Sequence, residues 1–216
     1  MLNAIELDKQ KGKIINLLEG TKREGMPDLI DDLIKNGFFE APASTRFHGC
    51  DVGGLAKHSL GVFDKLMELN HKVNLSKPTA YGQKPLEFTR ENLLIAALLH
   101  DICKAGAYVR TKADDGWTNN KKKDKGHAIL SIDRIKEHIK LDPIEEMMIR
   151  YHMGVYHVIE YDDKAGEYHL LSQTPDAPKE ERYGKSYRNA LYHNPIVKLI
   201  SIADELATME EKALEV

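Results

Sequence analysis

Apolar residues recur every three or four positions along most of the chain, a spacing that predicts amphipathic helices. Some ends are marked as well: Pro27 opens one predicted helix, and the Asn36-Gly37 pair closes it. Thr89 is a predicted N-cap, because its hydroxyl can accept a hydrogen bond from an unpaired backbone N–H. The predicted helices cover about residues 5–20, 27–36, 55–70, 89–104, 126–139, 143–152 and 195–211.

Two other stretches contain short runs typical of strands, each pair separated by a polar turn. The first turn contains Asp115-Gly116, a pair that favours a tight hairpin connection. The segment 172–187 is polar and contains two prolines, which favours a mobile loop. The predicted strand pairs are 108–111 with 117–118, and 155–161 with 167–171.

These elements predict an all-α fold, a helical bundle that carries two short β-hairpins as insertions. We expect residues 1–37 to form N-terminal helices that pack on the core and residues 38–216 to form the main domain. An insertion is expected at about 154–194. A length of 216 residues suits one domain with a sizeable core.

Composition changes this picture little. Apolar residues make up 42% of the chain and charged residues 30%, a balance typical of soluble globular proteins, and the net charge of −3 argues against a general nucleic-acid or membrane coat. Two cysteines, Cys50 and Cys103, cannot build a disulfide framework. The longest apolar run, residues 93–99, is far shorter than a membrane span of about 20 residues. We therefore expect a cytoplasmic protein without a membrane partner.

Candidate chemistry begins at His100-Asp101, which directly follows Leu98-Leu99 in the most apolar predicted helix. Burial of two polar groups there costs several kcal/mol unless they are paired or bound. A metal ion would satisfy both side chains. The sequence therefore predicts a metal site at the end of this helix.

Further ligand-type residues interrupt other predicted helices. His58 and Asp204 lie in otherwise apolar helix faces, His127 begins a predicted helix, and His152 ends one. A mixed imidazole and carboxylate set suits a divalent transition metal, as one or two ions of manganese, iron, nickel, cobalt or zinc.

Each residue taken alone has an ordinary interpretation. A single helical histidine is more often a satisfied polar residue than a ligand, and Asp204 could cap a helix or pair with a lysine. The joint pattern carries the metal hypothesis. The other histidines, apart from His48, are interpreted as ordinary surface or loop residues: His71, His138, His157, His169 and His193.

Three segments resemble the motif of the HD superfamily of metal-dependent phosphohydrolases. Gly-Gly-Leu-Ala-Lys precedes His58, Ala-Leu-Leu precedes His100-Asp101, and Leu-Ile-Ser-Ile-Ala precedes Asp204. The run 39–58 looks like the HD domain of bacterial 3′–5′ exoribonucleases that join an OB-fold to an HD domain. Too few residues precede Phe38 for an OB-fold, so we expect a stand-alone relative.

The resemblance covers roughly residues 38–210 and implies an all-α HD fold. It implies that His58, His100, Asp101 and Asp204 bind one metal ion. Some branches of the superfamily add two histidines for a second ion, about 25 residues apart after the His-Asp pair, and His127 and His152 fit that spacing. The Gly-Tyr-Pro motif of cyclic-dinucleotide phosphodiesterases is missing near His152, so cyclic di-GMP is not the favoured substrate.

The chemistry expected of such a centre is hydrolysis of a phosphoester by metal-activated hydroxide, with Asp101 as the bridging ligand of two ions. Lys104, three residues further along, is a candidate phosphate clamp, although a lysine at a helix end also suits the helix dipole. His48 and Arg46 precede the first ligand and are expected to bind phosphate, and His48 is also a candidate proton donor to the leaving group.

Several residues are candidates for contacts to a base or to a polyanion. Tyr108, Trp117, Tyr156 and Tyr187 could stack on a base as a lid, although packing within hairpins explains aromatic residues equally well. The run Lys121–Lys125 could attract a polyanion, but a solvated charge run is the commoner explanation.

The expected partner is a nucleotide or a short oligonucleotide, and a second copy of the chain is a candidate partner. Two other functions remain open at this point. One is an HD-type oxygenase with two iron ions in the same ligand set. The other is a nucleotide-binding HD module that keeps its metal for structure, although structural metal sites tend to be coordinatively closed.

Overall fold

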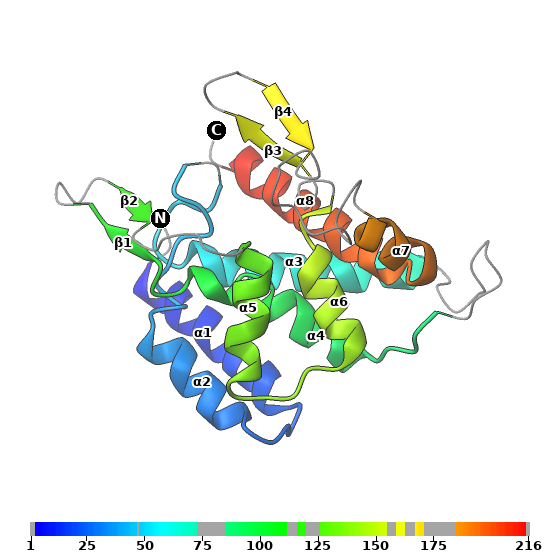
Figure 1. The fold of residues 1–216 in the computed structure, drawn as a ribbon. Coiled ribbons are helices and arrows are strands. Elements are labelled where there is room, and N and C mark those ends of the chain that lie inside the picture. The colour runs from blue at the N-terminus through cyan, green and yellow to red at the C-terminus, as the bar shows by residue number, and fades with distance from the viewer. Residues whose placement is uncertain are drawn as a thin grey trace.

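The computed structural model describes residues 3–46, 48–72, 85–111, 116–119, 126–154, 159–162, 167–170 and 185–214. Helices dominate, and the two strand pairs lie at the periphery (Figure 1). In chain order the elements are α1 Ala4–Glu19, α2 Met26–Lys35, α3 Gly54–Lys72, α4 Arg90–Leu99, the short 3₁₀ helix η1 Ile102–Lys104, β1 Tyr108–Arg110, β2 Trp117–Asn119, α5 His127–Lys136, α6 Pro143–Tyr151, β3 Ile159–Asp162, β4 Glu167–Leu170, α7 Lys185–His193 and α8 Ile196–Leu214.

Side-chain caps fix where several helices begin. Asn3 caps α1, Thr89 caps α4 and Asp142 caps α6, each within a reciprocal capping box. In every case the cap side chain accepts the N–H of the third helical residue, whose own side chain accepts the N–H of the cap. These local bonds satisfy backbone donors that would otherwise be unpaired at a helix start.

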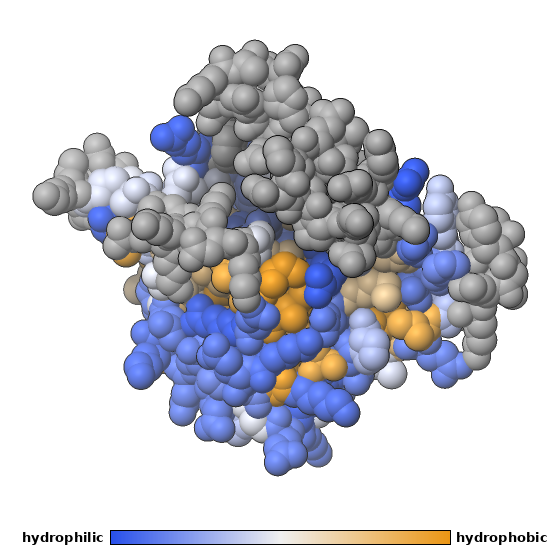
Figure 2. Space-filling model, in the orientation of Figure 1, coloured by the Kyte–Doolittle hydropathy of each residue, from blue (hydrophilic) through white to orange (hydrophobic). Residues whose placement is uncertain are grey.

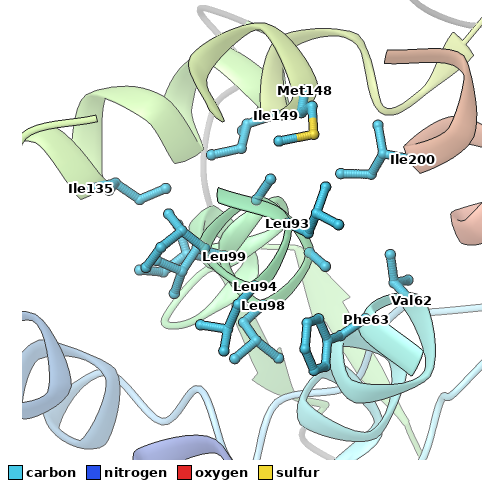
Figure 3. Close-up of a cluster of buried hydrophobic side chains, with 14 of the residues drawn as sticks. Val62, Phe63, Leu93, Leu94, Leu98, Leu99, Ile135, Met148, Ile149 and Ile200 are labelled. Carbon is cyan, nitrogen blue, oxygen red and sulfur yellow. The ribbon is translucent and has the colours of Figure 1, made fainter. Parts of the chain in front are cut away.

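The core is built around α4, whose residues 92–99 are all buried. Such a helix needs neighbours on every side, because apolar side chains project all around it. Figure 3 shows the leucines of α4 surrounded by side chains of α3, α5, α6 and α8. Truncation of a leucine such as Leu98 to alanine is expected to cost about 2–5 kcal/mol. The labelled neighbours are Val62 and Phe63 of α3, Ile135 of α5, Met148 and Ile149 of α6, and Ile200 of α8.

The N-terminal helices pack onto this core. α1 contacts α2, α3 and α4, and Arg23, between α1 and α2, bonds to carboxylates of α4 and α6. Its guanidinium lies 2.6 Å from Glu91 and 2.5 Å from Glu145, which is fully buried. The division of the chain at residue 37, like the insertion at about 154–194, stays a prediction.

The strands form two antiparallel pairs, β1 with β2 and β3 with β4. Tyr108 stands opposite Asn119 in the first pair, and Ile159 stands opposite Leu170 in the second. The prediction of an all-α fold with two short hairpins is confirmed. Residues 155–158 of the second predicted hairpin, and most of the polar segment 172–187, lie outside the described residues.

Two predicted boundaries are wrong. The helix predicted for 89–104 ends at Leu99, because the backbone leaves helical geometry at Asp101 (φ −115°, ψ 18°) and continues as η1. In addition, α7 begins at Lys185, inside the segment predicted as a mobile loop, and runs to His193. Its side chains Tyr187 and Ala190 are buried, so packing against the core stabilises a helix that a polar composition does not indicate.

Hydrophilic side chains cover the molecular face over α1 and α2, and apolar side chains gather nearer α5 and α6 (Figure 2). In the part of the chain that the structure describes, each helix is too short or too polar to span a bilayer.

Candidate metal centre

The polar pair of the sequence motif lies where α4 ends. His100 is the C-cap of α4 and is fully buried, and Asp101, the N-cap of η1, is 3% exposed. The end of the helix thus turns both side chains into the core region between α3, α5, α6 and α8. Both side chains are thus buried at the helix end, where the sequence predicts a metal site.

His100 and His152 are held in the same way, at the ends of two different helices. Each is a helix C-cap, and each has Nδ1 close to the carbonyl oxygen three residues earlier, at 2.8 Å to Ala97 and 2.7 Å to Ile149. A carbonyl only accepts, so each Nδ1 carries the proton and donates. Each Nε2 therefore presents a lone pair to the site.

The carboxylate of Asp101 faces two groups of partners. Its Oδ2 lies 2.6 Å from Nζ of Lys104 and 3.3 Å from Nε2 of His100. Its Oδ1 lies 3.7 Å from Nε2 of both His127 and His152. Among the described residues Oδ1 has no hydrogen-bond partner. A buried carboxylate oxygen without a partner is costly, so this atom is a natural ligand position.

His58 and Asp204 complete the centre from two helices that pack side by side, α3 and α8. Nε2 of His58 lies 3.0 Å from Oδ1 of Asp204, and the His58 ring centroid lies 5.4 Å from that of His100. Their side chains are 1% and 17% exposed. The alternative that Asp204 caps a helix does not fit its position inside α8.

His127 is the first residue of α5 and the most exposed of the six predicted ligands, at 32%. Its Nε2 lies 3.2 Å from Nε2 of His152. The structure thus brings all six predicted ligands together, including His127 and His152, whose positions at helix ends and whose spacing both suggested a role. Their assignment as ligands stays a prediction.

The residues fit a divalent metal. Ligand atoms cluster within 4.8 Å of one another in overlapping groups, which include His58 with His100 and Asp101, His100 with His152 and Asp204, and Asp101 with His127 and His152. Nε2 of His100, like Oδ1 of Asp101, is buried without a hydrogen-bond partner among the described residues. Both α4 and α6 also end at the centre, where the negative ends of their dipoles favour a cation.

Burial and charge act together on the acids and histidines. Burial opposes ionisation of Asp101, but the Lys104 ammonium and His100 hold its pKa well below the ordinary value. Burial and the neighbouring His100 lower the pKa of His152 to about 3. Burial alone would also lower the pKa of His58, yet its hydrogen bonds to Asp204 and Glu211 raise that pKa to about 9.

Lys104 connects the centre to the loop before α3. Besides Asp101, its ammonium donates to the carbonyl oxygen of Ala43 at 2.7 Å. The turn that carries it is anchored by Arg134 of α5, which donates to the carbonyl oxygens of Ile102 and Ala105 at 3.0 and 2.8 Å. Lys104 also ends the short helix η1, so the helix-dipole interpretation stays open beside its bonds to Asp101 and Ala43.

The loop 41–54 places His48 beside the first ligand. The His48 and His58 ring centroids are 5.0 Å apart, and Nε2 of His48 is buried with no hydrogen-bond partner among the described residues. Burial and the charges of His58 and Lys104 lower the pKa of His48 to about 4. The Arg46 side chain is exposed in the same loop.

The aromatic residues proposed as a lid have different positions. Tyr108 is half-buried close to Lys104, and Trp117 packs under Arg110, 4.4 Å from guanidinium to ring centroid. Tyr187 is 5% exposed against Tyr151, so the idea that it stacks on a base from a mobile loop is wrong. Tyr156 and the run Lys121–Lys125 lie outside the described residues.

Glu211 is a site residue that the sequence analysis missed. It is 7% exposed, and its Oε1 lies 3.1 Å from Nδ1 of His58. The available signal was its spacing: Glu211 lies seven residues after Asp204, two helical turns along α8, and therefore on the same face.

The helical fold and this centre together define a protein with a candidate divalent-metal site among α3, α4, α5, α6 and α8. The HD domain family matches residues 55–209, and the chain therefore belongs to the HD domain family, a superfamily of metal-dependent phosphohydrolases that bind divalent metals. No curated protein and no solved structure matches the chain.

Proposed function

We propose that this protein is a metal-dependent phosphohydrolase that cleaves a phosphoester of a nucleotide or a short oligonucleotide. The observation that carries the proposal is the placement of Asp101. One buried carboxylate oxygen faces His127 and His152, and the other faces His100 and Lys104. Family membership supports the hydrolytic class, and the substrate is part of the proposal.

His58, His100, Asp101 and Asp204 would hold one ion, and His127 and His152 would join Asp101 in holding a second. When bound, a divalent metal supplies an acidified water molecule and offsets the negative charge of a phosphate group. The protein supplies the fixed lone pairs of His100 and His152, and a carboxylate that two sets of ligands share. Catalytic metal sites keep a coordination position open, whereas structural sites tend to be closed.

Lys104 has two roles in this proposal. Two of its three N–H donors are used by described residues, Asp101 and the carbonyl of Ala43. The bond to Asp101 orients the carboxylate, and the third donor is proposed to bind a phosphate oxygen. The cation would also stabilise the negative charge that increases on the phosphate as the ester is cleaved.

His48 is proposed to hydrogen-bond the substrate. Its low pKa of about 4 makes it neutral at neutral pH, so the ring offers one N–H donor and one acceptor. Binding of a phosphate or leaving-group oxygen suits a neutral imidazole better than proton donation does. Arg46, in the same loop, and Tyr108, near Lys104, are proposed as further substrate contacts.

The proposed substrate class rests on the sequence motif around the first ligand. The run 39–58 resembles the HD domains of 3′–5′ exoribonucleases, which supports a nucleotide or the 3′ end of a short oligonucleotide as substrate. The described part of this loop is closely packed at Gly49 and Gly54 and carries His48 and Arg46. We propose that a phosphate group binds on this side of the centre.

The test is manganese-dependent hydrolysis of bis-p-nitrophenyl phosphate and p-nitrophenyl phosphate by the wild type, Asp101→Asn and Asp64→Asn. Asp64 is an exposed aspartate of α3 whose contact is a surface ion pair with Lys13, so its variant is the matched control. We expect turnover by the wild type and the control and loss of at least about 10²-fold in Asp101→Asn. A folded, metal-loaded wild type that cleaves neither ester, nor any nucleotide in a follow-up screen, would overturn the proposal.

A further inference from the structure

Glu211 contacts the first ligand from the side opposite the centre. Its Oε1 lies 3.1 Å from Nδ1 of His58, while Nε2 of the same ring lies 3.0 Å from Asp204. Both carboxylates belong to α8, two helical turns apart. The His58 ring is thus held at both nitrogens by one face of one helix.

His58 differs in this respect from the other two buried histidines of the centre. His100 and His152 donate from Nδ1 to backbone carbonyls of their own helices. His58 has instead a charged partner from a different helix. A carboxylate partner makes an imidazole a stronger donor to a metal at its other nitrogen, and it fixes both tautomer and ring orientation.

Glu211 is buried under the loop before α3, and burial of its charge costs free energy unless a partner compensates it. The loop before α3 packs directly against it: a Cβ added at Gly49 would lie 3.2 Å from Oε2 of Glu211. Gly49 has a φ of +52°, a conformation that favours glycine. Oε2 itself is buried without a hydrogen-bond partner among the described residues, and a buried charge needs a compensating one.

The net charge of the centre favours a bound cation. Among the described residues that form it, Asp101, Asp204 and Glu211 carry three negative charges, and Lys104 carries one positive charge. When the histidines are neutral, as metal ligands must be, two negative charges remain, which favours the binding of divalent cations. Glu211 therefore contributes to the attraction for a cation. Its ligand atom also lies within 4.8 Å of those of His48 and His58, but its Oε1 is paired with Nδ1 of His58 at 3.1 Å, on the far side of that ring from Asp204.

We propose that Glu211 is a positioning residue of the metal centre: it accepts the Nδ1 proton of His58 and so presents Nε2 of that histidine as the metal ligand. This inference rests on the metal centre of the proposed function. It assigns Glu211 no contact with substrate. Loss of Glu211 should lower the affinity for the metal. Without it the His58 ring can rotate or change tautomer, and Nε2 then no longer offers a lone pair to the ion.

The experiment measures the affinity of the full-length protein for Zn²⁺ by competition with a chromophoric chelator, in the wild type, Glu211→Gln and Glu210→Gln. Glu210 is the adjacent glutamate, 62% exposed and paired with Lys65 on the surface, so its variant controls for loss of one charge from the same helix. We expect Glu211→Gln to bind Zn²⁺ about 10- to 100-fold more weakly. Glu210→Gln should match the wild type. Glu211→Asp, which keeps the charge but is one methylene shorter, should recover part of the affinity.

A second measurement needs no variant. Long-range ¹H–¹⁵N NMR spectra of the zinc-loaded wild type should show His58 with a protonated Nδ1 and a metal-bound Nε2. A metal-bound Nδ1, or a Glu211→Gln affinity within about twofold of the wild type, would overturn the role of Glu211. Absence of Zn²⁺ binding by the wild type would instead overturn the metal centre itself, so the two failures are distinguishable.

Discussion

Lys104 donates to Asp101 over 2.6 Å inside the candidate centre, and the same ammonium holds the carbonyl of Ala43 in the loop that carries His48. The pair lies beneath the surface, with side-chain exposures of 17% and 4%. One cation therefore links the shared carboxylate of the centre to the proposed substrate-binding loop.

Replacement of Lys104 by methionine should both destabilise the metal-free protein and impair turnover. Loss of one partner of a buried ion pair leaves an uncompensated charge, at a cost of about 3–5 kcal/mol. Turnover should fall by about 10²-fold or more if the ammonium also binds the phosphate. Thermal unfolding and ester hydrolysis measure the two effects, with Lys57→Met, an exposed lysine of α3, as the control. Unchanged melting temperature and turnover in Lys104→Met would contradict this role.

Replacement of His127 by alanine should remove one of two ions and leave the other. His127 lies on the Oδ1 side of Asp101, beside His152, whereas His58 and Asp204 lie together at another part of the centre. Metal content per chain, measured by inductively coupled plasma mass spectrometry after manganese loading and desalting, should fall from about two to about one. His71→Ala, at the exposed end of α3, should keep both ions. Equal metal content in His127→Ala and the wild type would exclude the two-ion arrangement.

Metal binding should release about one proton at neutral pH. Without metal, His58 is protonated at pH 7 because its pKa is raised to about 9, whereas His152, with a pKa of about 3, is already neutral. A ligand nitrogen must lose its proton, so affinity should rise about tenfold per pH unit from pH 7 and level off near pH 9. Calorimetric titration in buffers of different ionisation enthalpy counts the released proton. Heats that do not depend on the buffer would show that His58 is neutral before binding.

Replacement of Gly54 by alanine should disrupt the loop that carries His48. An added Cβ would lie 1.9 Å from the carbonyl oxygen of Gly49, a distance that the backbone must relieve by moving. We expect destabilisation of about 1–3 kcal/mol and weaker substrate binding. Gly61→Ala lies in the same helix, and its Cβ would meet only an ordinary contact of 3.5 Å with Ala207. That control should be neutral or should stabilise the protein by up to about 1 kcal/mol, as measured by denaturant unfolding. Equal stability of the two variants would contradict the close packing of the loop.

The ligand set was predictable because its members interrupt apolar helix faces. The sequence alone shows polar residues at positions that the apolar pattern predicts to be buried. His100-Asp101 follows Leu98-Leu99 in this way, and Asp204 follows an apolar run. His127 and His152 are weaker signals, since they lie at predicted helix ends, and the family spacing added to them. Glu211 was not predictable in this way, since its partner is on α3, and the register between α3 and α8 is set by tertiary packing.

Local signals also failed where packing decided the structure. The apolar run of α4 gives no sign that the helix stops at Leu99. The turn that follows Asp101 is held by Arg134 of α5, which donates to the carbonyl oxygens of Ile102 and Ala105 and so comes from a distant part of the chain. The polar composition near Tyr187 predicted a loop, whereas its contact with Tyr151 stabilises a helix.

The central claim is that His58, His100, Asp101 and Asp204 form a divalent-metal centre. Calorimetric titration of chelator-treated protein with Mn²⁺ tests it directly, in the wild type, Asp101→Asn and Asp204→Asn, with Asp64→Asn as the surface control. We predict saturable binding of one or two ions per chain by the wild type and the control, and affinity at least about 100-fold weaker in both site variants. Equal binding by all four proteins, or no saturable binding by the wild type, would contradict the account.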